Sequence, residues 1–269
     1  MDNIKDVIKN RRSVRTFDGD PLSVEDRQKL DEYLKTLDNP FGIAVEFRFL
    51  NAKEHNLSSP VIVGTDCYIA AKVSRTPQYE VAYGYTFEKF CLYAQSLGIG
   101  TVMLGGTLSR KTFERAMELT DNEAMPVASP VGYPAEKLSV REKLMRKAVK
   151  ADERQPFEKL FFENSFATGL NKQRAGKIAD ALEMVRLAPS AVNKQPWRAV
   201  LCGDTVHFFE KKSKGMATDT LDIQKIDIGI ALAHFDLTLQ EQGIKGKFVN
   251  NKPDFDTETG LEYIISHQS

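Results

Sequence analysis

Apolar and polar positions along the chain follow two periods, one typical of amphipathic helices and one typical of half-buried strands. Apolar residues recur every three or four positions in five segments, and this spacing predicts helices at 4–10, 24–37, 78–97, 109–119 and 172–187. Segment 226–239 alternates almost as a strand would, so the helix predicted at 224–242 depends on its length, its similarity to segment 79–98 and the closing Gly243. Runs rich in branched and aromatic residues predict strands at 42–51, 60–64, 68–73, 101–104 and 127–133. Because helices and strands mix along the chain, we expect an α+β fold.

Local signals mark the ends of two of these helices. Ser23 precedes the second helix and Asp26 follows it by three residues, which is typical of an N-cap. Gly98 follows the helix at 78–97, in a position where a left-handed C-cap favours glycine. Segment 135–158 carries many charges and few apolar residues, so we expect an exposed crossover there.

Two of the helical segments resemble each other. Segments 79–98 and 224–243 align without a gap, and both end in glycine. Inside the alignment the identical pairs are Gly84 and Gly229, Phe90 and Phe235, Leu92 and Leu237, and Gln95 and Gln240. The alignment indicates an internal repeat. The alternative is two unrelated amphipathic helices with chance identities, because helical periodicity by itself produces matches.

Composition narrows the class of protein. The 269 residues are 42% hydrophobic and 28% charged, as in an ordinary globular protein. Lys plus Arg and Asp plus Glu both number 37, so a nucleic-acid-binding domain is not indicated. The three cysteines are widely spaced, and the four histidines lie far apart without metal-ligand spacing, so we expect no disulfide framework and no metal. The start of the chain is not a secretory signal and no apolar run is long enough to cross a membrane, so a cytoplasmic location is expected.

The strip from Arg11 to Arg15 is the densest group of anion-binding side chains in this chain of zero net charge. In an extended backbone alternate side chains share a face, so Arg11, Ser13 and Arg15 are expected to point together. Two guanidinium groups and a hydroxyl suit a phosphate. The alternative is a solvated helix end, whose arginines interact with the C-terminal dipole.

A second polar group lies in the segment 188–197, which follows the helix at 172–187. Pro189 and Pro196 bracket a turn that carries Ser190, Asn193 and Gln195. A carboxamide both donates and accepts hydrogen bonds, which suits the pyrimidine edge of a flavin. Composition alone also allows an ordinary helix-to-strand loop rich in turn formers.

Together the two groups resemble motifs of the FMN-dependent nitroreductases, in which Arg-Arg-Ser-Val-Arg follows an N-terminal helix and Ala-Pro-Ser-x-x-Asn-x-Gln-Pro-Trp precedes a strand. Segments 97–106 and 131–136 extend this resemblance. It implies a nitroreductase-like α+β fold of two half-repeats, each with a central mixed or antiparallel sheet flanked by helices.

The order of the motifs departs from the family pattern, because the proline-bracketed loop comes in the second half of the chain instead of shortly after the basic strip. The chain therefore resembles the double-length, single-chain nitroreductases that form a fused pseudo-dimer. This implies a half at 1–150 that carries the FMN phosphate site and a half at 151–269 that carries the flavin-contact loop. We expect one FMN per chain and a monomer that acts as a pseudo-dimer, with further dimerisation left open.

The resemblance implies cofactor contacts but neither a dedicated catalytic side chain nor a metal ligand. The expected phosphate contacts are Arg11, Arg12, Ser13 and Arg15, with Lys137 and Arg141 as helpers. The expected ring contacts are Pro189, Ser190, Ala191, Asn193 and Gln195, with backbone contributed by Gly105 and Gly106. The two glycines are equally compatible with a tight turn. His234, on an apolar helix, is expected to be a satisfied core histidine.

The function implied is an FMN-dependent NAD(P)H oxidoreductase that reduces a small molecule such as a nitroaromatic, a quinone or a similar electron-poor acceptor. Two other functions are compatible with the sequence. One is a non-catalytic protein that binds flavin or another small planar ligand on the same fold. The other is a structural module without flavin, which requires both motifs to be accidental.

Overall fold

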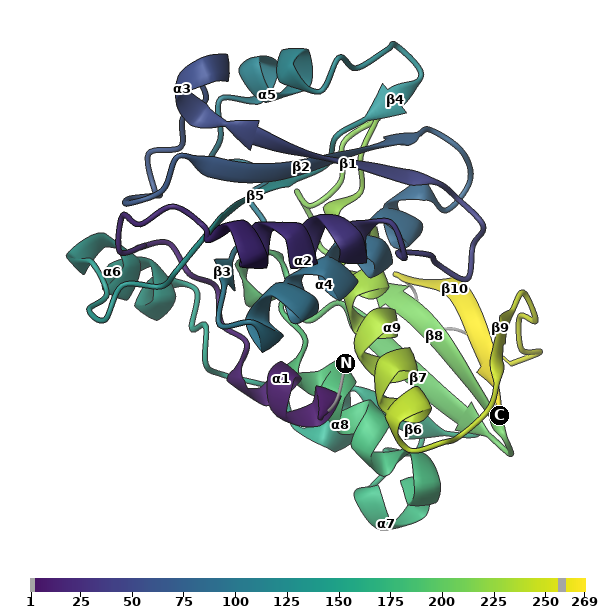
Figure 1. Ribbon diagram of the computed structural model, residues 1–269. Coiled ribbons are helices and arrows are strands. Elements are labelled where there is room, and N and C mark those ends of the chain that lie inside the picture. Colours follow the sequence, from purple (N-terminus) through teal and green to yellow (C-terminus); the bar gives the residue numbers. More distant parts are fainter. Residues whose placement is uncertain (1–2, 256–259) are drawn as a thin grey trace.

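The computed structural model describes residues 3–255 and 260–269, which form two sheets and the helices around them (Figure 1). The helices are α1 (Ile4–Asn10), α2 (Val24–Leu34), α3 (Ala52–His55), α4 (Tyr79–Ser96), α5 (Arg110–Ala116), α6 (Val140–Ala148), α7 (Lys172–Ala175), α8 (Ala179–Leu187) and α9 (Ile223–Glu241). Single 3₁₀ turns occur at Phe157–Lys159, Gly176–Ile178 and Ala191–Asn193. No helix in these described ranges is long and apolar enough to cross a membrane.

The first sheet is antiparallel, in the order β1-β2-β5-β3, and β4 pairs with β2. Its strands are β1 (Val45–Asn51), β2 (Cys67–Ser74), β3 (Gly100–Thr101), β4 (Glu123–Ala124) and β5 (Ala128–Gly132). In the register of β1 and β2, Val45 lies opposite Val73 and Asn51 opposite Cys67.

The second sheet is mixed, in the order β6-β7-β8-β10-β9, with only β6 and β7 parallel. Its strands are β6 (Phe161–Glu163), β7 (Trp197–Cys202), β8 (Thr205–Lys211), β9 (Lys247–Val249) and β10 (Leu261–Gln268). Each sheet has its own core. Tyr83 and Phe87 of α4 are buried with the first sheet, whereas Phe235 of α9 is buried with Trp197 and Phe208 of the second. The expected α+β class is confirmed.

Helices α4 and α9 lie between the sheets and pack on each other through glycine (Figure 1). A Cβ atom added at Gly84 would lie 2.1 Å from the carbonyl oxygen of Ile226. A Cβ atom added at Gly229 would lie 2.1 Å from the carbonyl oxygen of Val81. The sequence alignment places Gly84 opposite Gly229 and Val81 opposite Ile226, so the two close approaches are reciprocal. Only glycine allows backbones to approach this closely.

Several local predictions are confirmed. The Ser23 hydroxyl accepts from the Asp26 backbone N–H at 3.0 Å and caps α2, and Gly98 adopts the expected left-handed conformation with φ of 76°. The strip at 11–17 is extended. It joins its neighbours through isolated bridges from Ser13 to Thr101 and from Thr16 to Val63.

Other local predictions are wrong. Segment 60–64 is not a strand, since only Val63 forms a bridge, and the strand expected at 101–104 keeps only Thr101 in β3 and a bridge at Leu104. The helix expected at 172–187 is interrupted at Gly176, where a backbone with φ of 56° and ψ of −127° cannot continue a helix. The helices expected at 24–37 and 109–119 end early, at Leu34 and Ala116.

The crossover at 135–158 contains a helix, α6, that the sequence reading missed. The Ser139 hydroxyl accepts from the Glu142 backbone N–H at 3.2 Å and caps this helix. Serine followed three residues later by glutamate is a recognised capping signal, so the sequence did carry the information. The apolar Val140 and Leu144 are exposed on α6, so this helix lacks the buried apolar stripe by which an amphipathic helix is predicted.

Candidate functional site

A cavity of about 440 Å³ lies where the elements of the two sheets meet. One end is basic, with Arg11, Ser13 and Arg15. The walls come from α4, from the turn at 105–106, from the loop at 189–192 and from the first turns of α9. We call this cavity the cleft. Residues from both 1–150 and 151–269 therefore line one cleft.

Arg15 is a partly buried cation at the basic end of the cleft. Its guanidinium Nε is buried and has no hydrogen-bond partner among the described residues. Burial lowers the pKa of Arg15. The carboxylate of Glu142 opposes this shift, and the nearby Arg146 and Arg11 add to it. Glu142, on α6, accepts from the backbone N–H of Arg15 at 3.3 Å and not from its guanidinium group. The charge of Arg15 is thus open to an anionic ligand in the cleft.

Arg11 is held by a buried carboxylate on α4. Its Nε lies 3.7 Å from Oε1 of Glu88, and that oxygen is 2.8 Å from Nε2 of His234. The other ring nitrogen of His234 is 3.0 Å from the carbonyl oxygen of Met184. His234 is therefore the satisfied core histidine that the sequence predicted. Glu88 lines the cleft, yet nothing in the local sequence distinguishes it from an ordinary helix residue.

The proline-bracketed loop forms another part of the cleft wall. Val192, Asn193 and Gln195 all have positive φ values, of 44°, 56° and 50°. Such backbone conformations cost of the order of 1–3 kcal/mol each in a residue other than glycine, so other contacts must hold them. The Ser190 hydroxyl accepts from the backbone N–H of Gln195 at 2.9 Å, and the N–H of Ala191 donates to Asp227.

Asn193 and Gln195 do not line the cleft. The Asn193 amide donates to the carbonyl oxygens of Lys150 at 2.7 Å and Glu153 at 3.0 Å. The Gln195 side-chain oxygen accepts from the backbone N–H of Gln155 at 2.9 Å. Both side chains thus fasten the loop to the crossover. Their expected contact with a flavin ring stays a prediction.

The crossover also adds a cation that the sequence reading missed. Arg154 donates to Oδ1 of Asn193 at 3.4 Å and to the carbonyl oxygen of Leu187 at 3.2 Å. Burial lowers the pKa of Arg154, and the neighbouring Arg11 and Arg186 lower it further. Arg154 therefore belongs to the same group of close, partly buried cations as Arg11 and Arg15.

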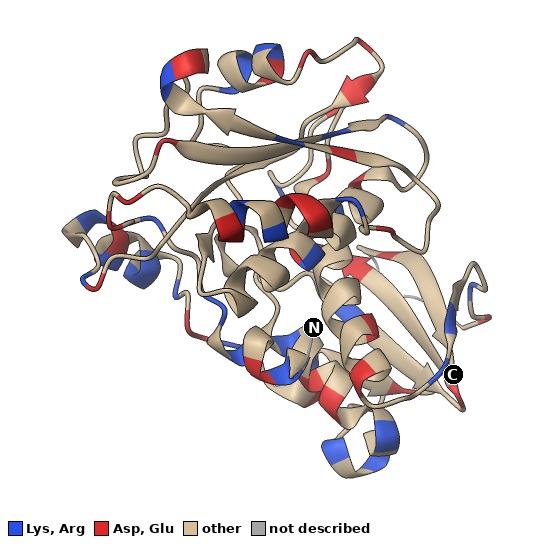
Figure 2. Cartoon of the chain, in the orientation of Figure 1, with Lys and Arg blue, Asp and Glu red and all other residues tan. Residues whose placement is uncertain are grey.

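The remaining expected residues divide between the cleft wall and the outside. Gly105 and Gly106 line the cleft, and Arg110 donates to the carbonyl oxygen of Gly105 at 2.6 Å, which fixes this turn. Arg12, Lys137 and Arg141 do not line it. Lys137 is exposed beside α6, and Arg141 donates to the carbonyl oxygen of Pro60. Figure 2 shows that blue Lys and Arg positions outnumber red acidic positions along α6.

The end of the cleft away from Arg15 is apolar and is partly built by segment 213–221 between β8 and α9. Met216 and Leu221 of this segment line the cleft. The carbonyl oxygen of Thr220 accepts from Arg75 and from the hydroxyl of Tyr79, both at 2.7 Å. These two donors come from the first half, so segment 213–221 reaches across the cleft and is anchored on its far side.

Comparison with known families gives one match. The sequence profile of a family described as "Putative TM nitroreductase" matches residues 3–239. The chain belongs to this nitroreductase family. A comparison with curated proteins finds no match.

Solved structures agree with the family assignment. A "putative nitroreductase" from Thermotoga maritima is 20% identical, covers 99% of this chain and 93% of its own, and superposes with a TM-score of 0.64. This likeness shows that the chain has the nitroreductase-like fold.

Shorter proteins match about half of the chain. An FMN-dependent nitroreductase from Clostridium difficile is 14% identical and covers 49% of this chain and 88% of its own, with a TM-score of 0.42. An iodotyrosine deiodinase crystallised with FMN and 3-iodo-L-tyrosine is 13% identical and covers 51% and 92%, also with a TM-score of 0.42.

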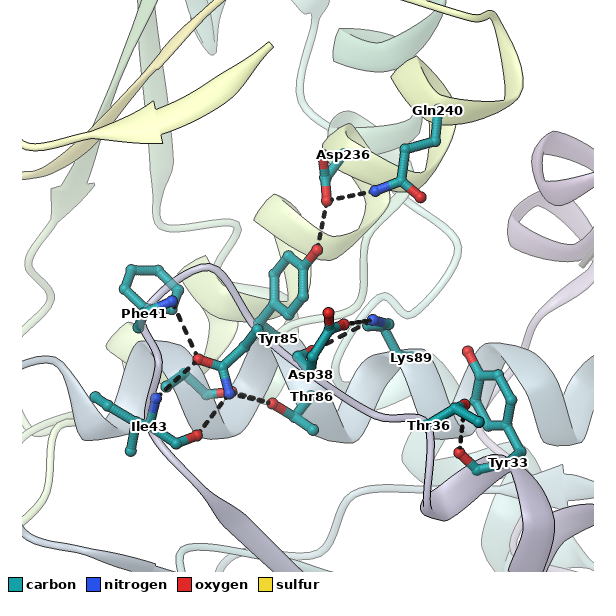
Figure 3. Close-up of polar contacts among 12 residues, drawn as sticks. Tyr33, Thr36, Asp38, Phe41, Ile43, Tyr85, Thr86, Lys89, Asp236 and Gln240 are labelled. Atoms are coloured by element: carbon teal, nitrogen blue, oxygen red, sulfur yellow. Dashed lines mark hydrogen bonds and ion pairs between the residues drawn. The ribbon is translucent and has the colours of Figure 1, made fainter. Parts of the chain in front are cut away.

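This member of the nitroreductase family has no proline-bracketed loop after its basic strip, and the segment at 38–43 occupies that place in the sequence. The Asn39 amide donates to the carbonyl oxygen of Ile43 at 2.7 Å and to the hydroxyl of Thr86 at 3.2 Å, and its side-chain oxygen accepts from the N–H of Phe41 (Figure 3). Phe41 packs against the core of the second sheet. Asn39 therefore holds segment 38–43 together and joins it to Thr86 of α4.

Proposed function

We propose that this chain is an FMN-dependent oxidoreductase that takes electrons from NAD(P)H and passes them to an electron-poor small molecule such as a nitroaromatic or a quinone. The observation that carries this proposal is one cleft in which an arginine whose buried Nε has no hydrogen-bond partner among the described residues adjoins a largely apolar cavity of ring-binding size. We also expect the protein to act in the cytoplasm, without a nucleic-acid or membrane partner.

The basic end of the cleft fits a phosphate. The buried Nε of Arg15 lacks a partner, and a phosphate oxygen would accept from it. Ser13 adds a hydroxyl on the same side of the cleft, and Arg11 adds a second guanidinium group. Arg11 is held by Glu88, so its orientation is set before a ligand arrives.

The rest of the cleft fits a planar ring. Its volume of about 440 Å³ falls within the range of small-molecule pockets, and the walls include Met103, Pro189, Ile226 and Ile230. Gly105 and Gly106 place main chain against the cleft without a side chain between. The carbonyl oxygen of Gly105 already accepts from Arg110, so this contact fixes the turn and leaves that oxygen less available to a ligand.

A flavin, when bound, would supply the hydride chemistry. The chain would then have three tasks: to anchor the phosphate at Arg15, to fix the ring between the loop at 189–192 and the turn at 105–106, and to keep water from the ring with segment 213–221. None of these tasks needs an acid or base side chain, so we assign no catalytic residue.

One cleft per chain is supported by the way the two halves meet. The reciprocal packing of Gly84 on Ile226 and Gly229 on Val81 is the contact expected at a two-fold axis between equivalent helices. We propose that residues 1–150 and 151–269 form a pseudo-dimer that binds one FMN. The basic strip of the first half and the loop of the second half would complete a single site.

The first test is the visible absorption spectrum of the purified protein after it is saturated with FMN, with the flavin counted per chain after heat release. We expect close to one FMN per chain and bleaching by NADH or NADPH without oxygen. No FMN binding would reject the proposed function. Tight binding without bleaching by either nucleotide would favour the non-catalytic flavin binder.

The second test replaces Arg15 by Gln. Because a hydrogen bond to a charged group contributes about 1.5–3 kcal/mol, FMN should bind this variant about tenfold or more weakly. Riboflavin lacks the phosphate and should bind the variant and the wild type alike. Arg12→Gln is the matched control, since it removes the same charge outside the cleft wall. Equal losses of FMN and riboflavin would remove Arg15 from the phosphate site.

A further inference from the structure

Asp227 is a buried carboxyl group that lines the cleft and that the function described above does not use. It lies on α9 and is only 3% exposed. Its two oxygens lie 3.0 and 3.1 Å from a single donor, the backbone N–H of Ala191. Among the residues that the structure describes, no cation contacts it. A carboxylate with two oxygens and one neutral donor is poorly compensated in a buried place.

The charged groups that face Asp227 are acidic. Asp222 is the N-cap of α9, and Glu210 on β8 is fully buried. From α4, Glu80 lies 3.4 Å from the backbone N–H of Asp222. Burial raises the pKa of Asp227 well above its usual range. The Ala191 N–H opposes this shift, and Asp222 and Glu210 add to it.

The two lysines that lie near Glu210 are engaged elsewhere. Lys225 lies 2.9 Å from Glu262, and Lys212 also pairs with Glu262. Neither lysine is among the groups that affect Asp227. Apart from the single N–H of Ala191, the surroundings of Asp227 that the structure describes therefore favour the uncharged acid.

Neutrality would give this part of the cleft wall a donor that the backbone of Pro189 and Ala191 does not supply. The N–H of Ala191 points at Asp227 and is not available to a ligand, and Pro189 has no N–H. The neighbouring side chains of Ile226 and Ile230 are apolar. A carboxylic acid at this place accepts from Ala191 through one oxygen and has an O–H left to donate.

We propose that Asp227 is a neutral carboxylic acid whose O–H donates a hydrogen bond to a carbonyl oxygen of the planar ligand in the cleft. The proposal rests on the proposed function and assigns Asp227 as a residue that positions and tunes the ring. A donor at a ring carbonyl stabilises the negative charge that the ring gains on reduction, so it also favours the reduced ligand.

The first experiment compares FMN affinity in Asp227→Asn and Asp227→Leu, measured by quenching of flavin fluorescence. The amide of Asn still donates and accepts, so we expect its affinity to stay within about threefold of the wild type. Leu has a similar size but no donor, so we expect a loss of about tenfold. Equal affinities in the wild type and both variants would overturn the proposal while leaving FMN binding intact.

The second experiment does not depend on FMN. The infrared difference spectrum between the wild type and Asp227→Asn should contain the carbonyl stretch of a carboxylic acid at neutral pH. Carboxylate bands in its place would overturn the proposal. Failure of the wild type to bind FMN would reject the proposed function instead, so the two failures can be told apart.

Discussion

Glu210 shows at the residue scale how burial sets the behaviour of one carboxyl group. The residue is fully buried on β8, and neither of its oxygens has a hydrogen-bond partner among the described residues. Burial raises the pKa of Glu210 to about 7, with a smaller contribution from Asp222. In the unfolded chain a glutamate ionises near pH 4.5. Between these two values the unfolded state releases a proton that the folded state keeps.

This difference predicts a pH dependence of stability. As the pH rises from about 4.5 to about 7, the free energy of unfolding of the wild type should fall relative to that of Glu210→Gln, because only the wild type must keep a buried proton. Urea unfolding of both proteins at a series of pH values measures the difference. A constant difference across this range would contradict the prediction.

Glu262 is a control with the opposite sign. Its hydrogen bonds with Lys212 and Lys225 outweigh its burial and lower its pKa. The stabilisation that Glu262 provides should therefore be present above its usual pKa and be lost as the pH falls through the lowered value. Glu262→Gln should be less stable than the wild type at neutral pH, and this deficit should shrink in acid.

At the scale of elements, the contact between α4 and α9 decides how the two sheets are joined. The carbonyl oxygens of Ile226 and Val81 occupy the space that a Cβ atom would need at Gly84 and Gly229. Both obstacles are backbone atoms, which cannot move as a flexible side chain can. The helices must separate to admit even a methyl group.

Gly84→Ala and Gly229→Ala are therefore each expected to lower the free energy of unfolding by about 3 kcal/mol, at the upper end of the usual cost of overpacking. The double variant should lose less than the sum, because either methyl group alone opens the same contact. Chemical denaturation measures these values. Gly106→Ala is the control, since an added Cβ there meets no atom within 4 Å. A loss below about 1 kcal/mol at Gly84 would contradict the close approach.

At the scale of the whole molecule, one chain lines the whole cleft, so we expect the cleft to be independent of protein concentration. Its basic end and its loop wall belong to one chain, so dilution cannot separate them. The FMN-bound protein should have a mass of 30.2 kDa for its chain by light scattering. The dissociation constant of FMN should not change with the concentration of the chain. An affinity that falls on dilution would mean that a second copy completes the site.

The sequence by itself determined the features that depend on neighbours along the chain. The period of apolar residues predicted α4, whereas α9 was predicted from the repeat, the length and the closing Gly243. Alternation along the strip placed Arg11, Ser13 and Arg15 on one face. The pair Gly84 and Gly229 belonged to the repeat, and Ser139 with Glu142 carried the signal for the start of α6. These signals are local because a hydrogen bond or a shared face within an element joins residues a few positions apart.

Only the tertiary structure decided which distant residues meet. Glu88 and Asp227 line the cleft and Arg154 neighbours Arg11, yet the three come from separate segments and nothing near them in the sequence indicates this. Asn193 and Gln195 are the opposite case: the motif predicted that they contact a ligand, but their side chains bond to the crossover instead. The burial, the hydrogen-bond partners and the pKa of a side chain depend on the residues around it. Those residues come together only when the two halves of the chain pack against each other.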